Sequence, residues 1–371
     1  MSNRQLSILG LLAAVFLGLA IAQSRFSSAN RSSAVGAVKL IQGLATGQIS
    51  SIELGRGENP VSLKKDSGGF VVASRDNYPA QTQTINELLI SCLDIEVIEK
   101  VTGNPENHAE LEVTEETAGS IVKFFDKDGK LITGVMVGKS TAQGGAHVRL
   151  TNSDDVYVAV QAPRLRTAAT DYIDKKLTEV AKDDVEKVTV KSGTETYTVL
   201  MDGAGKAYLA QIPAGKKQKE TEVDQLAAAL SSMNFSDVQK ESDKTRAFDF
   251  GTSYLCKLKD STIYKFDFAK DGDKHYLKCT ADFLDKIESV SKEEVATEQA
   301  MKAKEKQILA QQAALEFAGR HQGWVYEVSS WEAGKLTKKL DDLLEDIEEE
   351  AEETDAPAVE TPVLNSDPNA P

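Results

Sequence analysis

The chain has 371 residues, enough for two domains of ordinary size, and its 41% hydrophobic and 27% charged content is typical of a folded protein. The net charge of −15 lies mostly in the tail, because residues 341–371 hold 12 Asp or Glu and no Lys or Arg. The remainder lacks the basic face that phosphate binding requires, so nucleic-acid-binding proteins are excluded.

An apolar run near the N-terminus predicts export. It begins at Leu6, ends at Ala22 and gives way at once to polar residues. Its 17 residues are near the lower limit for crossing a bilayer, and residues 20–22 offer a small-x-small cleavage site. A signal anchor and a cleaved signal peptide over residues 1–25 both stay open. The body is then extracytoplasmic, either on a single-pass cell-membrane protein or exported after cleavage near Ala22.

After a linker at residues 26–48, the body repeats one pattern in residues 49–170 and 185–285, at offsets of 134 to 138. Each segment opens with three runs of alternating apolar residues separated by turns, which predicts a three-stranded meander. The matching alternations are those of Ile52 and Leu54 with Val188 and Val190, of Val61 and Leu63 with Tyr197 and Val199, and of Phe70 and Val72 with Ala207 and Leu209.

A proline and then a helix follow each meander. Pro79 and Pro213 cannot join a central strand ladder. Next, Thr84 with Glu87, and Thr221 with Asp224, fit a capping box, in which a hydroxyl and a carboxylate satisfy free backbone donors. The apolar stripes behind these pairs differ by 138 in number and predict equivalent helices: Ile85, Leu88, Leu89 and Cys92 in one, and Val223, Leu226, Ala227 and Leu230 in the other.

Further alternating runs close each unit. They predict strands over residues 121–125, 131–137, 148–150 and 156–160 in the first unit, and over 254–258, 263–268 and 276–279 in the second. Each unit is therefore expected to be a βββαβββ arrangement, with one helix packed on an antiparallel sheet, in the α+β class. Residues 171–184 are expected to connect the two.

The C-terminal region, residues 286–347, is expected to be helical with one short strand. Residues 291–321 are rich in Ala, Gln, Glu and Lys, which predicts a long solvated helix. A short strand with Trp324, Tyr326 and Trp331 follows. Residues 348–371 form an acidic tail that we expect to be disordered. A final amphipathic helix before the tail is indicated by Leu336, Leu340, Leu343, Leu344 and Ile347.

No motif predicts catalytic, cofactor-binding or metal-ligating residues. Residues 134–140 resemble a phosphate-binding loop, but the first glycine would have to replace Thr133, and a strand rather than a helix follows, so nucleotide binding is not expected. The acidic turns at residues 126–129 and 271–273 lack the central glycine and distal glutamate of a calcium loop. We interpret both as hairpin turns.

The histidines and cysteines are isolated in the sequence. His108 and His321 have no nearby ligand pattern, and we interpret the similar places of His147 and His275 as a repeated strand position. Cys92 falls on the apolar face of a predicted helix and is expected to be buried. The other two cysteines leave a disulfide open, although a meander would place another strand between them: Cys256 and Cys279.

Short motifs along the body resemble those of a bacterial envelope family, the domain-of-unknown-function family 4340. They are found at residues 70–73, 77–80, 100–102, 104–107, 111–113, 137–139, 148–150, 156–158 and 323–326. The resemblance covers residues 49–344. It implies an N-terminal membrane segment and an extracytoplasmic repeat region. Because relatives are often encoded beside ABC transporters of the gliding-motility type, it also implies an accessory or substrate-handling role, and it implies no catalytic residues.

The sequence therefore favours a non-enzymatic extracytoplasmic binding or scaffolding protein that serves a membrane transporter or an envelope complex. Its expected partners are the membrane, through the run from Leu6 to Ala22, and a transporter or envelope protein. The alternative is an envelope hydrolase whose site lies between the two repeat units, because carboxylates and basic residues are abundant enough to build one.

Overall fold

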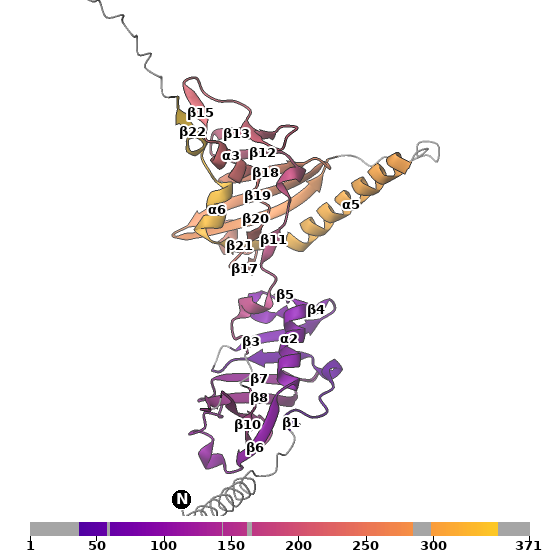
Figure 1. The fold of residues 1–371 in the computed structure, drawn as a ribbon, viewed down its shortest axis with the longest axis vertical. Coiled ribbons are helices and arrows are strands. Elements are labelled where there is room, and N and C mark those ends of the chain that lie inside the picture. Colours follow the sequence, from indigo (N-terminus) through magenta and orange to yellow (C-terminus); the bar gives the residue numbers. More distant parts are fainter. Residues whose placement is uncertain (1–36, 58–59, 143, 162–164, 285–297, 348–371) are drawn as a thin grey trace, which may run out of the picture.

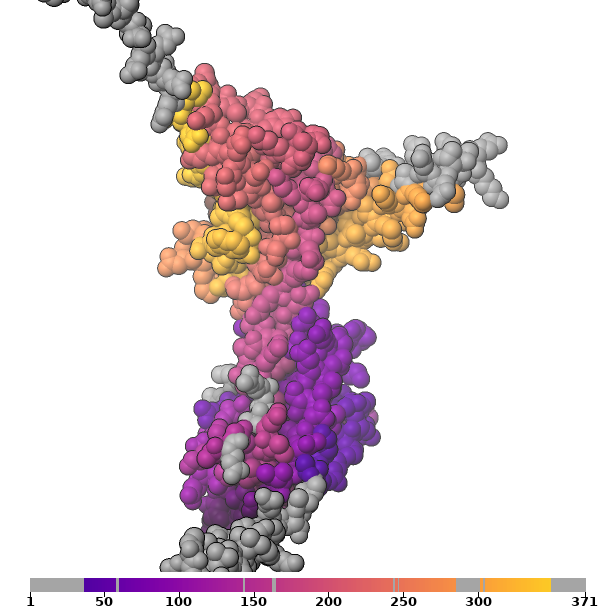
Figure 2. Space-filling view, viewed as in Figure 1, coloured from indigo at the N-terminus to yellow at the C-terminus, as the bar shows by residue number. Residues whose placement is uncertain are grey.

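A computed structural model describes residues 37–57, 60–142, 144–161, 165–284 and 298–347. It contains two large antiparallel sheets that are stacked along the longest axis of the molecule (Figure 1). Helices pack on both sheets, so the predicted α+β class is confirmed. A narrow waist separates the two sheet units (Figure 2).

The first sheet has the strand order β1-β6-β10-β9-β8-β7-β2-β3-β4-β5. Alternating apolar residues form these strands, and the face that they share is buried. The bounds are β1 Val38–Lys39, β2 Ser51–Leu54, β3 Val61–Asp66, β4 Gly69–Val72, β5 Tyr78–Pro79, β6 Glu96–Thr102, β7 Ser120–Phe125, β8 Leu131–Ser140, β9 Ala146–Leu150 and β10 Val156–Ala159.

Two different elements cover this sheet. Helix α2, Thr82–Leu93, packs its buried stripe into the main core, together with Val122 and Phe124 of β7. Ile121, whose side chain alternates with these, belongs to a second, smaller core beneath the loop of residues 103–119. The loop contains the 3-10 turn Pro105–Asn107.

The second sheet has the order β14-β13-β12-β18-β19-β20-β21-β17. Starting from β14, this order matches that of the first sheet from β4 to β6. Strand β14 thus takes the place of β4, and β17 takes the place of β6. The bounds are β12 Val185–Ser192, β13 Glu195–Met201, β14 Ala207–Leu209, β17 Asp237–Lys240, β18 Thr252–Leu258, β19 Thr262–Asp271, β20 Lys274–Phe283 and β21 Trp324–Val328. Two small ladders accompany it: β11 Lys176–Thr178 with β16 Met233–Asn234, and β15 Lys216–Gln218 with β22 Leu344–Asp346.

The helices of the second unit differ in how they contact its sheet. Helix α3, Glu220–Ala227, lies against β12 and β14, and the short α6, Ser330–Leu336, lies beside it. The C-terminal part of the long α5, Glu298–His321, packs on β20, and the rest of the helix projects from the body as an arm (Figure 1). A further short helix, α4, spans Asp243–Arg246.

Three features of the arrangement differ from the expected βββαβββ unit. After the helix of each unit, the chain first forms an edge strand, which is β6 in the first unit and β17 in the second. This strand pairs with the last closing strand, β10 or β21, at the end of the sheet away from the meander. The short strand expected in a separate C-terminal region is β21, which completes the second sheet beside β20. Trp331 lies not on that strand but on α6.

The expected final helix is wrong. The leucines at three- and four-residue spacing are divided among α6, a 3-10 turn at Leu340–Leu343 and the strand β22. Leu336, Leu343 and Leu344 are nonetheless buried. Pairing of β22 with β15 thus overrides the local helical pattern.

The predicted capping boxes are also wrong, although both helices exist. Helix α2 begins two residues before Thr84, whose hydroxyl donates to the side chain of Gln81 at 2.7 Å. Helix α3 likewise begins before Thr221, after Lys219. The apolar stripes were predicted correctly, because Leu88 and Leu226 are both buried.

All three cysteines are unbonded and buried. Cys256 on β18 and Cys279 on β20 have β19 between them, as a meander requires. Burial raises the pKa of the Cys92 and Cys256 thiols to about 12, so both are inert as nucleophiles at neutral pH.

The expected membrane segment and acidic tail lie outside the described residues. Within the ranges that the structure describes, no helix is both long and apolar enough to span a bilayer.

Candidate functional site

The two sheets meet edge to edge, through the β5 side of the first and β17 of the second. Arg75, in the 3-10 turn Ala73–Arg75 before β5, places Nε 2.5 Å from Oδ1 of Asp237. The backbone amide of Lys240 donates to Oδ2 of Asp76 at 2.9 Å. A carboxylate from the first unit thereby satisfies a backbone donor on the edge of the second.

Aromatic side chains fill the centre of this junction. The ring of Tyr78 on β5 lies edge-on to Trp324 at 4.9 Å and to Phe235 at 6.0 Å between centroids. Tyr326 packs on Phe235 at 4.9 Å, and its hydroxyl lies 2.6 Å from Nδ1 of His321. These edge-on contacts suit the ring quadrupoles and exclude water from the junction.

Burial changes the acidity of the junction groups. It raises the pKa of Tyr78 and of Tyr326, because a phenolate would be poorly solvated there. Burial, followed by the positive charge of Arg320, lowers the pKa of His321 from 6.5 to about 4. The imidazole is therefore neutral at pH 7 and acts as a hydrogen-bonding core residue.

A polar cleft of about 300 Å³ opens beside the junction, lined by residues of both units. Arg75 pairs with Asp237 across it, and Lys274 pairs with Glu327 at 2.7 Å. Tyr276 completes the lining. Two ion pairs thus line this cleft between the units.

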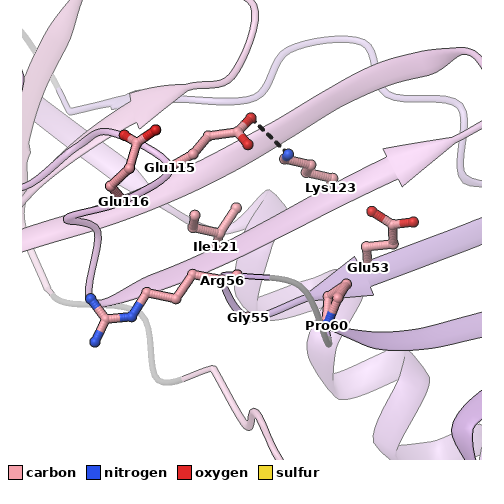
Figure 3. A pocket seen from close by; sticks show the side chains of 9 residues that line it. Glu53, Gly55, Arg56, Pro60, Glu115, Glu116, Ile121 and Lys123 are labelled. Carbon is pink, nitrogen blue, oxygen red and sulfur yellow. Dashed lines mark hydrogen bonds and ion pairs between the residues drawn. The ribbon is translucent and has the colours of Figure 1, made fainter.

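A second pocket, of about 460 Å³, lies over β2 and β7 of the first sheet (Figure 3). Glu53 and Lys123 are opposite each other in the strand ladder, and Glu115 reaches Lys123 at 2.7 Å. Arg56 extends away from this pair and donates to the Ala118 carbonyl at 3.3 Å. Within the described residues, no cluster of His, Cys, Asp or Glu could hold a metal ion.

The glycines of the segment that resembles a phosphate loop lie inside strand β8 and serve packing. A Cβ atom on Gly134 would lie 2.5 Å from the Val122 carbonyl oxygen, and one on Gly138 only 2.3 Å from that of Leu111. No helix N-terminus follows, so the backbone forms no phosphate cradle here. These glycines allow the chain to pass closely over the sheet.

Gly138→Ala is expected to lower the free energy of unfolding by about 1–3 kcal/mol, because backbone rather than a flexible side chain must give way. Urea unfolding followed by circular dichroism measures the change. Gly68→Ala is the matched control, since that position is open, and it should stay within about 0.5 kcal/mol of wild type. Equal effects of the two substitutions would contradict this explanation.

Several family-like motifs of the first unit meet at one place, the loop of residues 103–119. Lys139 donates its amide to the Leu111 carbonyl, and Arg149 donates Nε to the Val113 carbonyl at 2.9 Å. His108 is buried, with Nε2 2.9 Å from the Asp154 carbonyl oxygen. These motifs therefore fix a loop on the sheet, a role that their separation in the sequence did not reveal.

The remaining predicted positions are scattered. His147 on β9 and His275 on β20 lie in different sheets and are not brought together. Asp126 accepts from the amides of Asp128 and Lys130, which closes the hairpin between β7 and β8. The junction, by contrast, joins residues of two family-like motifs, Tyr78, Trp324 and Tyr326, with residues that no motif marked: Arg75, Asp237, Phe235 and His321.

Part of the chain matches a known protein family. Residues 71–249 match the family model described as "Domain of unknown function (DUF4340)". No curated protein and no solved structure matches the chain. The matched residues run from β4 to the segment before β18, so they include both sides of the junction formed by Arg75 and Asp237. The chain thus carries a DUF4340 domain over residues 71–249.

Proposed function

We propose that this protein is a non-enzymatic, extracytoplasmic binding or scaffolding module, tethered to the membrane and accessory to a transporter or an envelope complex. The observation that carries the proposal is that three basic groups lining the two pockets are paired with carboxylates. Arg75, Lys123 and Lys274 each contact a carboxylate at 2.7 Å or less. Side chains committed in this way hold a surface together and are not free to act on a substrate.

The proposal includes the origin of the body as two copies of one unit. The parallel strand orders, the helix that follows each meander, and the buried pair Leu88 and Leu226 support it. On this basis β6 and β17 are equivalent edges. The second unit differs by α5, which lies between β20 and β21, whereas only a short turn joins β9 to β10.

The tether would be the apolar run from Leu6 to Ala22. The first described strand, β1, pairs with β6 at the end of the first unit that lies away from the second (Figure 1). A body anchored through this run would therefore stand off the membrane, with its first unit nearer to the lipid.

Fractionation tests the location. The full chain is expected in the membrane fraction, and a variant without residues 1–25 is expected to be soluble and folded. Recovery of the full chain from the cytosol would contradict the proposal, whereas a soluble product cut after Ala22 would favour a cleaved signal. Affinity capture from detergent-solubilised membranes should co-purify a transporter or envelope protein, and its absence would count against the accessory role.

The second candidate function, an envelope hydrolase, is favoured by one observation. Asp76, Asp237 and Tyr276 line the same cleft between the two units. Hydrolysis of ester, amide or glycoside probes by the wild-type chain, lost in Asp237→Asn and retained in Asp94→Asn on the surface of the first unit, would establish it. That result would overturn the non-enzymatic proposal.

A further inference from the structure

The edge strand β6 is paired along only one of its sides within the described residues. On its inner side it pairs with β10 along its length, through partners from Val97 to Thr102. On its outer side the described chain supplies only β1, at Glu96 and Val97. Among the described residues, 98–102 therefore have a strand partner on one side alone, and Ile98 and Val101 are 47% and 42% exposed. An open edge with apolar side chains is a template for strand addition.

An apolar pocket adjoins this edge. It has a volume of about 440 Å³, and its apolar lining comes from Val38, Leu40, Val97, Ile98, Leu150 and Tyr157. The two lysines at its rim are paired, Lys39 with Glu96 at 3.1 Å and Lys100 with Asp155 at 2.6 Å. The pocket thus suits an apolar side chain and offers no unpaired lysine to an anionic ligand.

The equivalent edge in the second unit is already used for contact. The outer side of β17 faces the first unit, where Asp76 accepts from the Lys240 amide and Arg75 pairs with Asp237. This fold therefore uses that edge as an interface, and the ladder of β1 on β6 shows that the corresponding edge of the first unit accepts a strand.

We propose that residues 98–102 of β6 form a docking site for an extended segment of a membrane partner protein, which adds as a strand and places one apolar side chain in the pocket. This inference rests on the proposed tethered function. The edge lies at the end where the described chain begins, and hence nearest the membrane under that proposal (Figure 1). A second copy joined through the same edge would set two bodies end to end, which does not suit two chains standing off one membrane.

Binding of a defined peptide tests the site. The probe is a fluorescein-labelled octapeptide of alternating valine and threonine, added to the full chain in lipid nanodiscs and followed by fluorescence anisotropy. Saturable binding is expected. A matched peptide with alternate amides N-methylated should bind at least tenfold more weakly, because it cannot complete the ladder. Ile98→Asp should weaken binding of the first peptide equally, whereas Ile90→Asp, at a 57% exposed position on α2, should not.

Several outcomes would overturn the proposal. They are no saturable binding, equal binding of both peptides, or equal effects of Ile98→Asp and Ile90→Asp. Val101→Lys replaces Ile98→Asp if circular dichroism shows that the latter is unfolded. If the peptide binds only after residues 33–36 are replaced by Gly-Ser, the edge belongs to the chain's own upstream segment, and the proposal is wrong.

The same variants separate this inference from the proposed function. If Ile98→Asp abolishes peptide binding and also releases the protein captured with the wild-type chain, both stand. If the captured protein stays bound to Ile98→Asp, the docking site is wrong while the accessory role stands. If peptide binding shows the expected pattern but no membrane protein is ever captured, the accessory role fails while the strand-addition site stands.

Discussion

Leu226→Ala is expected to lower the free energy of unfolding by about 2–5 kcal/mol, the range for truncating a fully buried leucine. The Leu226 side chain has no exposed surface and lies on α3 within the core of the second unit. Its carbonyl also accepts the hydroxyl of the buried Tyr254 at 3.0 Å. Alanine is a strong helix former, so the helix should persist and the loss should come from the cavity.

Leu88→Ala on α2 is expected to fall in the same range, because Leu88 is only 5% exposed. Both tryptophans, Trp324 and Trp331, lie in the second unit, so urea unfolding followed by their fluorescence reports on that unit, while circular dichroism reports on both. Leu226→Ala should therefore lower the urea concentration at the midpoint of the fluorescence transition. Ile90→Ala, at an exposed site, is the control, and a loss for Leu226→Ala no larger than for this control would contradict the packing argument.

Acidification is expected to destabilise the protein through His321. The folded state holds the pKa of this imidazole at about 4, against an ordinary 6.5, chiefly by burial. Between these values the unfolded chain binds a proton that the folded chain does not. Stability is therefore complete above about pH 6.5 and falls as the pH decreases toward 4, by about 3 kcal/mol in total for this group.

The measurement is the free energy of unfolding from urea titrations at pH 7, 6, 5 and 4, for wild type and for His321→Gln. The variant should be less stable at pH 7, because the contact with Tyr326 is altered, but should lose the His321 part of the slope. Leu226→Ala, which lowers stability without removing an ionisable group, is the control. It should lower stability at every pH and keep the slope; an unchanged slope in His321→Gln would refute the assignment.

Strands were easier to predict from the sequence than helix ends. Alternation such as that of Ile52 with Leu54 marks one buried face, and the structure places these residues on β2 with no exposed surface. Thr84 and Thr221 had the right chemistry for capping but lie inside the first turn of their helices, because the helices start earlier in the chain. Local chemistry selects among several starting points, and tertiary packing decides which one is used.

Pairing between segments far apart in the sequence was the other feature that could not be predicted. The Trp324 strand could be recognised, but not its place beside β20, because α5 separates the two in the sequence. The leucines from Leu336 to Leu344 fit a helix equally well until the β15 partner of β22 is known. The junction was expected as a place of interest between the units, yet its charged pair was not identified, since Arg75 and Asp237 are 162 positions apart and belong to no motif.

The position of α5 also affects the order of folding. In the first unit about five residues separate β9 from β10, whereas about 40 separate β20 from β21. Closing the longer loop costs about 2 kcal/mol more in chain entropy, if both are treated as flexible, so β21 should join its sheet late. When the chain emerges with its N-terminus first, the first sheet can form once residue 159 has emerged, while the second must wait for Val328. Until then β20 and β17 both lack their common neighbour, and the nascent chain exposes two strand edges that a chaperone could shield.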